Sequence, residues 1–309
     1  MRGLQLIPQN TTIDFVSKKK MVFFFSLAIM LGSIFSVFID GINFGIDFKG
    51  GFLIEARTEE PADFGSLRQK LEALNLGDVK LQEFGSDRDI MIRIEQQPGG
   101  EKAQNAALGK IKAALGEKIN YRRVETVGPK ISQDLIRNAV LALLWALGGM
   151  LIYVWLRFEW QFSVCAIFAL AHDTFAILGL YGLTNLEFNE TAIIAILTTI
   201  GYSVNDTVVI YDRIRENLRK YKKADMGEVI NRSINDTLSR TALTSTTTLL
   251  ALLCLYFFGG SVVASFILPI IVGVMVGTYS SICLASLLLL NFKIYRGEDS
   301  HLTQGEEGV

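Results

Sequence analysis

Six long apolar windows, separated by charged stretches, dominate the pattern of hydrophobic and polar positions along this chain. Each window has roughly the 20 residues that a helix needs to cross the hydrocarbon core of a bilayer. The pattern predicts six membrane-spanning helices, at residues 21–39, 139–156, 162–183, 191–210, 241–258 and 262–290. The first window is followed by Asp40-Gly-Ile-Asn-Phe44 rather than by a small-residue cleavage site, so we expect it to remain as an anchor.

Lysine and arginine are distributed unevenly between the predicted loops. They precede the first window as Arg2 and Lys18-Lys19-Lys20, and they crowd the stretch between Arg213 and Lys223. The loops 184–190 and 258–261 contain none. Because basic loops stay on the cytoplasmic side, both termini are predicted to be cytoplasmic. The regions between the spans are then a cytoplasmic N-terminus 1–20, a far-side segment 40–137, a cytoplasmic loop 211–240 and a cytoplasmic tail 291–309, with disorder expected at 296–309.

The far-side segment carries the patterns of a small α+β domain at residues 51–129. Period-two alternation predicts strands, and apolar residues three and four apart predict helices. The predicted strands are 52–58, 79–84, 90–94 and 121–127, the helices are 64–74 and 103–115, and a turn is expected at 85–89. This order, βαββαβ, is typical of the ferredoxin-like arrangement. The module has no nucleophile beside a base, no metal-ligand cluster and no phosphate loop, so we expect it to bind or move rather than to catalyse.

The fourth window contains a carboxylate, Asp206, in a stretch that otherwise has the composition of a membrane helix. A charged residue at the centre of a span costs roughly 2.5–3.5 kcal/mol on insertion scales, and such residues usually carry a function. Thr199, Tyr202 and Ser203 precede Asp206 at spacings of three and four. This spacing predicts one polar face along the helix.

Arg240 begins the fifth window at a depth that matches Asp206 in the antiparallel fourth window, and Thr244 lies on the same helix face. The two charges predict an ion pair. It is either a static bridge that fixes the helix register or a switch in which Asp206 gains and loses a proton. Burial favours the neutral carboxyl, whereas a nearby guanidinium, which stays charged, favours the carboxylate. We hypothesise the switch; full activity in an Asp206→Asn variant would contradict it.

A second acidic residue, Asp173, follows His172 near the middle of the third window. We expect Asp173 to belong to the same proton relay. His172 is a further candidate, as are Tyr202, Ser203 and Thr244, although a lone histidine in an apolar helix is more often a structural hydrogen-bonding residue. Adjacent helical residues point about 100° apart, so His172 and Asp173 need not touch. No second His or Cys stands at ligand spacing, so no metal site is predicted.

Composition restricts the partners and the chemistry further. Lys plus Arg number 30 against 31 for Asp plus Glu, so net charge gives no reason to expect a nucleic-acid partner. Cys165, Cys254 and Cys283 lie in apolar windows without CxxC spacing, which predicts small hydrophobic side chains rather than redox chemistry. Gly273 and Gly277 in the sixth window, like the hydroxyl-rich start of the fifth, predict close helix packing.

Several short motifs, met in order from about Lys18 to Leu290, resemble the SecD/SecF family of membrane subunits of the bacterial Sec protein-export machinery. They are Gly45-Ile-Asp-Phe-Lys-Gly-Gly51, Val127-Gly-Pro129, Ala171-His-Asp173, Gly201-Tyr-Ser-Val-Asn-Asp206, Asp212-Arg-Ile-Arg-Glu-Asn217, Arg240-Thr241 and Phe258-Gly-Gly260. The motif or hinge residues taken from them are Gly45, Asp47, Gly50, Gly51, Gly128, Pro129, Gly201 and Asn205.

The resemblance implies a member of the RND superfamily of proton-driven machines in the bacterial inner membrane. It implies a SecD partner in a twelve-span complex, association with the SecYEG channel and often YidC, and unfolded preproteins as substrates. It assigns proton transport to an aspartate of the fourth span and an arginine of the fifth, which correspond here to Asp206 and Arg240. Protons are then the coupling ion, no other cofactor is expected, and the subunit is not an enzyme. We expect a periplasmic module that hinges near Gly50-Gly51 and Gly128-Pro129.

Two other classes of protein remain open. An RND-type exporter of small lipophilic molecules usually has two six-span halves with large periplasmic domains, whereas this chain holds one half and a small module. Co-purification distinguishes an export subunit from an exporter. The subunit would co-purify with a Sec partner, whereas the exporter would form self-trimers or retain bound lipid. A membrane-embedded hydrolase needs a motif such as G-x-S-x-G or HExxH, which the sequence does not contain.

Overall fold

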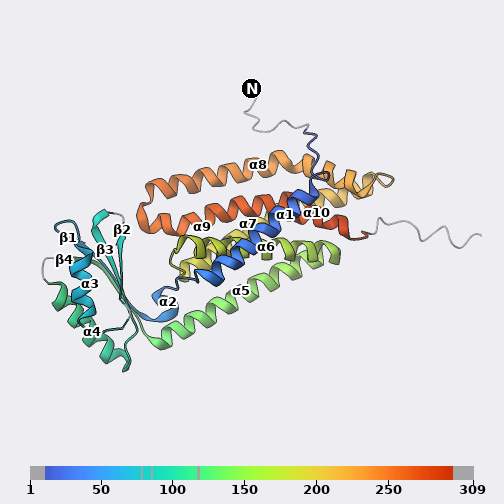
Figure 1. Ribbon diagram of the computed structural model, residues 1–309. Coiled ribbons are helices and arrows are strands. Elements are labelled where there is room, and N and C mark those ends of the chain that lie inside the picture. The colour runs from blue at the N-terminus through green and yellow to red at the C-terminus, as the bar shows by residue number, and fades with distance from the viewer. Residues whose placement is uncertain (1–10, 78, 85, 117–118, 295–309) are drawn as a thin grey trace, which may run out of the picture.

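Long helices run side by side and carry a small α/β module at one end (Figure 1). The computed structural model describes residues 11–77, 79–84, 86–116 and 119–294, so the predicted disorder at 296–309 lies outside the described residues. The long helices are α1 (Lys19–Ile39), α5 (Pro129–Arg157), α6 (Trp160–Thr184), α7 (Glu190–Lys220), α8 (Met226–Phe258) and α9 (Gly260–Tyr279). Within these ranges, six helices are long and apolar enough to cross a membrane.

The sixth apolar helix changes its winding before it ends. After α9 the chain continues as a π-helix (Ser280–Ala285), then α10 (Ser286–Leu288) and a 3₁₀ turn (Leu289–Asn291). A π-helical turn inside a longer helix is uncommon and is often found at a functional site. The turn places a run of small polar side chains inside the bundle, where they meet α6 and α7.

The helices differ greatly in how far the bundle covers them. Of the apolar stretch of α6, 56% is buried, and of α7 44%, whereas the values for α5 and α8 are 6% and 11%. Figure 1 places α5 and α8 on opposite outer sides. A helix that is apolar on every side and yet uncovered must be covered by lipid or by another protein. The buried centre therefore consists of α6 and α7 with α9 against them.

Polar sequence after the fourth window continues as helix, as predicted, and forms a hairpin with the start of α8. The Asn217 amide donates to Ser233 Oγ at 2.9 Å and to Asp236 at 3.1 Å, and Arg213 pairs with Asp236 at 2.8 Å. Asp225 caps α8 by accepting from the Gly227 N–H at 2.9 Å. These bonds hold the predicted loop 211–240 as two helical arms joined by a short turn.

The α/β module consists of β1 (Gly51–Thr58), α3 (Phe64–Glu72), β2 (Val79–Phe84), β3 (Ser86–Glu95), α4 (Gly100–Leu115) and β4 (Ile119–Val127). In the described residues these strands form a four-stranded antiparallel sheet in the order β2-β3-β1-β4. Alternate residues of β1, Phe52, Ile54 and Ala56, are buried against the helices. Leu53 and Glu55 point to the other face, which lines a cavity of about 800 Å³ shared with the end of the bundle.

The turn predicted at 85–89 is wrong, because β3 already begins at Ser86. Asp89 lies opposite Arg57 of β1 and accepts two hydrogen bonds from its guanidinium, at 2.7 and 2.6 Å. These bonds hold the pKa of the Asp89 carboxyl down at about 2, with a further contribution from the Ser86 hydroxyl. Polar residues typical of a turn thus extend the strand, because an ion pair across the sheet satisfies them.

The chain enters β1 through a sharp bend at Gly50 and Gly51, whose φ angles are +73° and +124°. A Cβ atom on Gly51 would lie 2.2 Å from the carbonyl oxygen of Ile94, which is backbone and cannot move aside. Glycine is therefore required at this position on steric grounds. At the other end of the module, Gly128 precedes Pro129, the first residue of α5. Both predicted hinge pairs lie where the module joins the bundle.

Candidate functional site

Two carboxylates are buried in the helix bundle. Asp173 of α6 is fully buried and Asp206 of α7 is 3% exposed. Both lie on α6 and α7, the helices that the bundle covers best. The predictions that placed Asp173 and Asp206 in the interior agree with this geometry.

Asp173 accepts hydrogen bonds from three sides. Its Oδ2 accepts from the hydroxyls of Ser203 on α7, at 2.6 Å, and Ser280 on the π-helix, at 2.7 Å. Its Oδ1 lies 3.1 Å from Nδ1 of His172, so these adjacent residues do touch, although helical geometry does not require it. Asp173 therefore joins three segments of the bundle, and charge-assisted bonds of this kind are stronger than those between neutral groups.

The hydroxyl groups around Asp173 continue into a chain of hydrogen bonds. Ser281 donates to the backbone carbonyl of Ser203 at 2.9 Å, and Thr207 donates to Ser281 Oγ at 2.8 Å. Sequence reasoning named Ser203 but missed Thr207, Ser280 and Ser281. The signal was the polar run Thr278-Tyr-Ser-Ser281 inside the last apolar window. The sequence alone did not show that the π-helix buries both Ser280 and Ser281 inside the bundle.

The direct ion pair predicted between Asp206 and Arg240 is not formed in this structure. Arg240 is an exposed residue on α8, whereas Asp206 is buried. The ion pairs of 4.0 Å or less between described residues do not join them. The Arg240 charge still acts on the Asp206 carboxyl through space. Arg240 therefore influences Asp206 electrostatically but does not contact it.

Asp206 Oδ2 is one of several buried polar atoms that have no hydrogen-bond partner within the described part of the chain. The others in the helix bundle include His172 Nε2, Thr199 Oγ1 and Thr241 Oγ1. Leaving a buried polar atom unpaired costs about 1–3 kcal/mol, so such a group usually has a functional role or binds water. These atoms lie on α6, α7 and α8.

The polar stripe predicted along α7 divides between two neighbouring helices. Tyr202 donates to Ser245 of α8 at 3.2 Å, and Ser245 lies 2.8 Å from the Thr278 hydroxyl of α9. Ser203 instead faces Asp173. The candidate Thr244 donates to the Thr241 carbonyl of its own helix at 2.9 Å, so its hydroxyl is not in contact with either carboxyl in this structure.

Close packing of α9 against α7 depends on two glycines, as predicted. A Cβ atom on Gly273 would lie 2.3 Å from Thr199 Oγ1. One on Gly277 would lie 3.0 Å from the Ser203 Cβ and 3.6 Å from Asp173 Oδ2. The two glycines thus let the backbone of α9 approach the polar residues of α7, in the manner of small-residue contacts between membrane helices.

The motif after the first span contacts the loop between α6 and α7. The Gly45 N–H donates to the Phe188 carbonyl at 2.9 Å, and the Phe188 N–H donates to the Asn43 carbonyl at 2.9 Å. Asp47 accepts from the Glu190 N–H at 3.0 Å and so caps α7. Gly45 and Asp47 therefore position the start of the helix that carries Asp206. By contrast, Gly201 and Asn205 lie on an exposed face of α7.

The same loop holds the module against the bundle. Glu187 forms an ion pair with Arg93 of β3, and Arg93 also donates to Asn43 at 3.3 Å. Burial raises the pKa of Glu187, and the Arg93 charge opposes that rise. An acid and a base from two separate parts of the fold thus meet at their junction.

Two protein families match this chain. The family described as "Protein export membrane protein SecD/SecF, C-terminal" matches residues 107–294, and the family described as "SecD/SecF GG Motif" matches residues 35–62. The first match covers more than half of the chain. The chain belongs to the SecD/SecF family of protein-export membrane proteins, which confirms the resemblance seen in the motifs.

Named relatives and solved structures agree with this family. The chain is 45% identical over 291 residues to the protein translocase subunit SecF of Rickettsia rickettsii (strain Sheila Smith), which covers 94% of each chain. It is 41% identical over 303 residues to that of Cereibacter sphaeroides, covering 95% of this chain and 94% of the relative. The crystal structure of SecDF, a translocon-associated membrane protein from Thermus thermophilus, matches 93% of this chain at 38% identity and a TM-score of 0.82. This chain spans 39% of that SecDF chain.

Proposed function

We propose that this chain is a proton-coupled, non-enzymatic subunit of preprotein export that acts with a SecD partner beside the SecYEG channel, in some assemblies together with YidC. The single observation that carries the proposal is the buried pair of carboxylates, Asp173 and Asp206, in a member of a protein-export family. Among the described residues Asp206 Oδ2 has no hydrogen-bond partner, so that oxygen can gain or lose a proton without breaking a hydrogen bond. Protons are the coupling ion in this proposal, with no other cofactor.

The proposed topology follows the charge distribution. The bundle end that carries Arg157, Arg213 and Arg219 faces the cytoplasm, together with both termini, and the α/β module faces the periplasm. The order of its strands and helices supports a ferredoxin-like module. The membrane is the bacterial inner membrane.

An exposed face of α7 is proposed to meet the SecD partner. Ile194, Thr198, Gly201 and Asn205 recur at spacings of four, three and four and are all exposed. A polar amide such as that of Asn205 is unfavourable in hydrocarbon, and a glycine lets another helix approach closely. The Thermus thermophilus SecDF chain, of which this chain spans 39%, supplies more sequence than this subunit alone. A SecD helix on this face would satisfy Asn205.

One proton can supply the free energy that the proposed work needs. Its transfer across 100 mV releases about 2.3 kcal/mol from the electrical component alone. The coupling between two sites of a protein typically amounts to about 1–3 kcal/mol. One protonation cycle at Asp206 is therefore enough to bias a module between two positions.

The proposed function predicts a gradient-dependent step late in export. In vesicles that contain the SecYEG channel, a SecD partner and this chain, a proton gradient should increase preprotein release several-fold, because the gradient drives the protonation cycle. The measurement is the protease-accessible, released fraction with the gradient present and after a protonophore has collapsed it. Vesicles without this chain are the control. If the gradient increases release equally in those vesicles, the proposal is contradicted.

Movement of the module is expected to be part of that step. A short bismaleimide that joins Arg93→Cys of β3 to Glu187→Cys of the α6–α7 loop should stop late release, because it fixes the module to the bundle where the two residues now pair. Both cysteine pairs are introduced into a variant in which the native Cys165, Cys254 and Cys283 have been replaced. The matched control joins Arg57→Cys to Asp89→Cys, which face each other inside the sheet. Unchanged release with the first linker, once cross-linking is verified by mass, argues against a moving module.

A further inference from the structure

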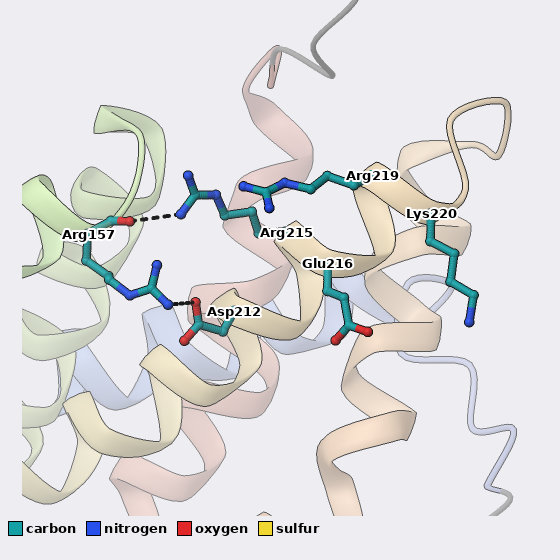
Figure 2. Close-up of a pocket in the computed structure, with 6 residues that line it drawn as sticks. All are labelled: Arg157, Asp212, Arg215, Glu216, Arg219 and Lys220. Carbon is teal, nitrogen blue, oxygen red and sulfur yellow. Dashed lines mark hydrogen bonds and ion pairs between the residues drawn. The ribbon is translucent and has the colours of Figure 1, made fainter.

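A pocket of about 420 Å³ lies at the end of the bundle opposite the module, where the α5–α6 turn meets the outer part of α7 (Figure 2). It is lined by Arg157, Asp212, Arg215, Glu216, Arg219 and Lys220. Half of these residues belong to the motif Asp212-Arg-Ile-Arg-Glu-Asn217, which the proton relay does not use. The pocket is therefore a separate feature of the fold.

The charges of the pocket do not balance. Four of its residues are cationic and two are acidic. Asp212 pairs with Arg157 at 2.7 Å, and Glu216 pairs with Arg213, outside the pocket, at 2.7 Å. Arg215 donates to the Arg157 carbonyl at 3.1 Å, and the described residues give neither it nor Arg219 a carboxylate partner. The pocket thus keeps an excess of positive charge.

Two arginines of the pocket, Arg215 and Arg219, extend toward its Arg157 side (Figure 2). Figure 2 shows the Arg215 side chain extending toward Arg157 and the Arg219 side chain extending in the same direction, toward Arg215, while the Glu216 carboxylate points away from them. Arg215 is held in place because it caps the last carbonyl of α5. Two guanidinium groups at one site repel each other unless an anion lies between them, and their planar donors suit phosphate oxygens.

The surface next to the pocket is apolar and exposed. Trp155 and Leu156 of α5 are 63% and 79% exposed, and Trp160 at the start of α6 is 56% exposed. Tryptophan is favoured at the level of the lipid headgroups, and α5 is the least covered of the spans. A molecule in the pocket therefore adjoins a lipid-facing helix on one side and the aqueous phase on the other.

We propose that this pocket binds the phosphate headgroup of an anionic phospholipid, whose acyl chains lie along the exposed face of α5. Basic pockets between helices at the cytoplasmic surface are suited to such headgroups, since the positive charge and the apolar wall are used together. The lipid would fix the α7 extension to the membrane surface. The proposal needs only that the bundle spans a membrane, so it stands or falls separately from proton coupling.

Lipid binding by the purified full chain tests the proposal. The chain in a neutral detergent is titrated with phosphatidylglycerol, with phosphatidylcholine as the zwitterionic comparison, and bound lipid is counted by native mass spectrometry. Wild type should retain phosphatidylglycerol preferentially. Arg219→Gln/Lys220→Gln should weaken that binding at least about tenfold, given a contribution of roughly 1 kcal/mol per basic residue near the surface. Glu216→Gln should strengthen it, a change of opposite sign that misfolding cannot imitate.

The matched control is Lys19→Gln/Lys20→Gln, which removes two exposed cations at the same end of the bundle but outside the pocket. It should leave binding nearly unchanged. Equal binding by wild type and the pocket variant overturns the proposal. Displacement of the lipid by low-millimolar inorganic phosphate also overturns it, since the site would then take a soluble anion. Loss of the lipid when a SecD partner is bound would show instead that the pocket is a protein contact.

Discussion

Replacing Asp206 with Asn is expected to abolish the gradient-dependent part of preprotein release while the helix bundle stays folded. The amide has the shape of the carboxyl but cannot gain and lose a proton. Asp206 is buried and its Oδ2 has no hydrogen-bond partner within the described chain, so a neutral side chain of the same shape breaks no hydrogen bond of that oxygen. Release in the vesicle assay should fall to the level seen with a protonophore, with no decrease in the thermal unfolding midpoint.

The control for this prediction is Asp134→Asn, which makes the same chemical change on the exposed surface of α5. That variant should keep wild-type release in the presence of the gradient. If Asp206→Asn also responds to the gradient as wild type does, Asp206 is a structural residue. The relay would then have to run through Asp173, the other buried carboxylate.

The Asp173→Ala variant is expected to lower the free energy of unfolding of the bundle by about 3 kcal/mol. The substitution leaves the Ser203 hydroxyl and the Nδ1 of His172 without their Asp173 acceptor, and the Ser280 hydroxyl keeps only the Gly277 carbonyl, at 3.1 Å. Each buried group left unpaired costs about 1 kcal/mol or more. Single hydrogen bonds between membrane helices average only about 0.6 kcal/mol and reach about 1.7 kcal/mol, whereas Asp173 is shared by three donors and its bonds are charge-assisted.

A compensating variant separates this explanation from simple loss of packing. Adding Ser203→Ala and Ser280→Ala to Asp173→Ala removes two hydroxyl donors together with the acceptor they share, and should restore about half of the lost stability. Unfolding in mixed micelles, followed by near-ultraviolet circular dichroism, gives the comparison. If the triple variant is less stable than Asp173→Ala by the sum of the two serine variants measured alone, the hydrogen-bonded network contributes nothing beyond packing.

The spans and most elements of the module could be read from the chain because their patterns are local. A strand such as β2 alternates at period two, and the apolar windows exceed the bilayer thickness wherever the chain folds. The prediction of a turn at 85–89 failed for a non-local reason. Asp89 accepts hydrogen bonds from Arg57, a residue 32 positions away on another strand. Local polarity alone cannot distinguish a solvated turn from a strand stabilised by an ion pair across the sheet.

The buried carboxylates were predicted from the sequence, but most of their partners were not. A charge in an apolar window is conspicuous in any sequence, so Asp173 and Asp206 could be found. Ser280 contacts Asp173 from 107 positions along the chain, and it does so because the last span changes to a π-helix there. Sequence spacing placed Arg240 at the depth of Asp206, yet the rotation of α8 leaves Arg240 exposed.

The sequence by itself determined the number and limits of the apolar spans, the order of strands and helices in the module, and the family. It also identified Asp173 and Asp206, because charged residues in a membrane helix usually carry a function. Only the tertiary structure decided that Asp173 is held by three donors while Asp206 keeps a free oxygen, and that Arg93 meets Glu187 at the junction of module and bundle. The physical reason is that periodicity records which face of an element avoids water. Which faces then meet depends on the rotation and sliding of whole helices, set by distant packing such as Gly273 against Thr199.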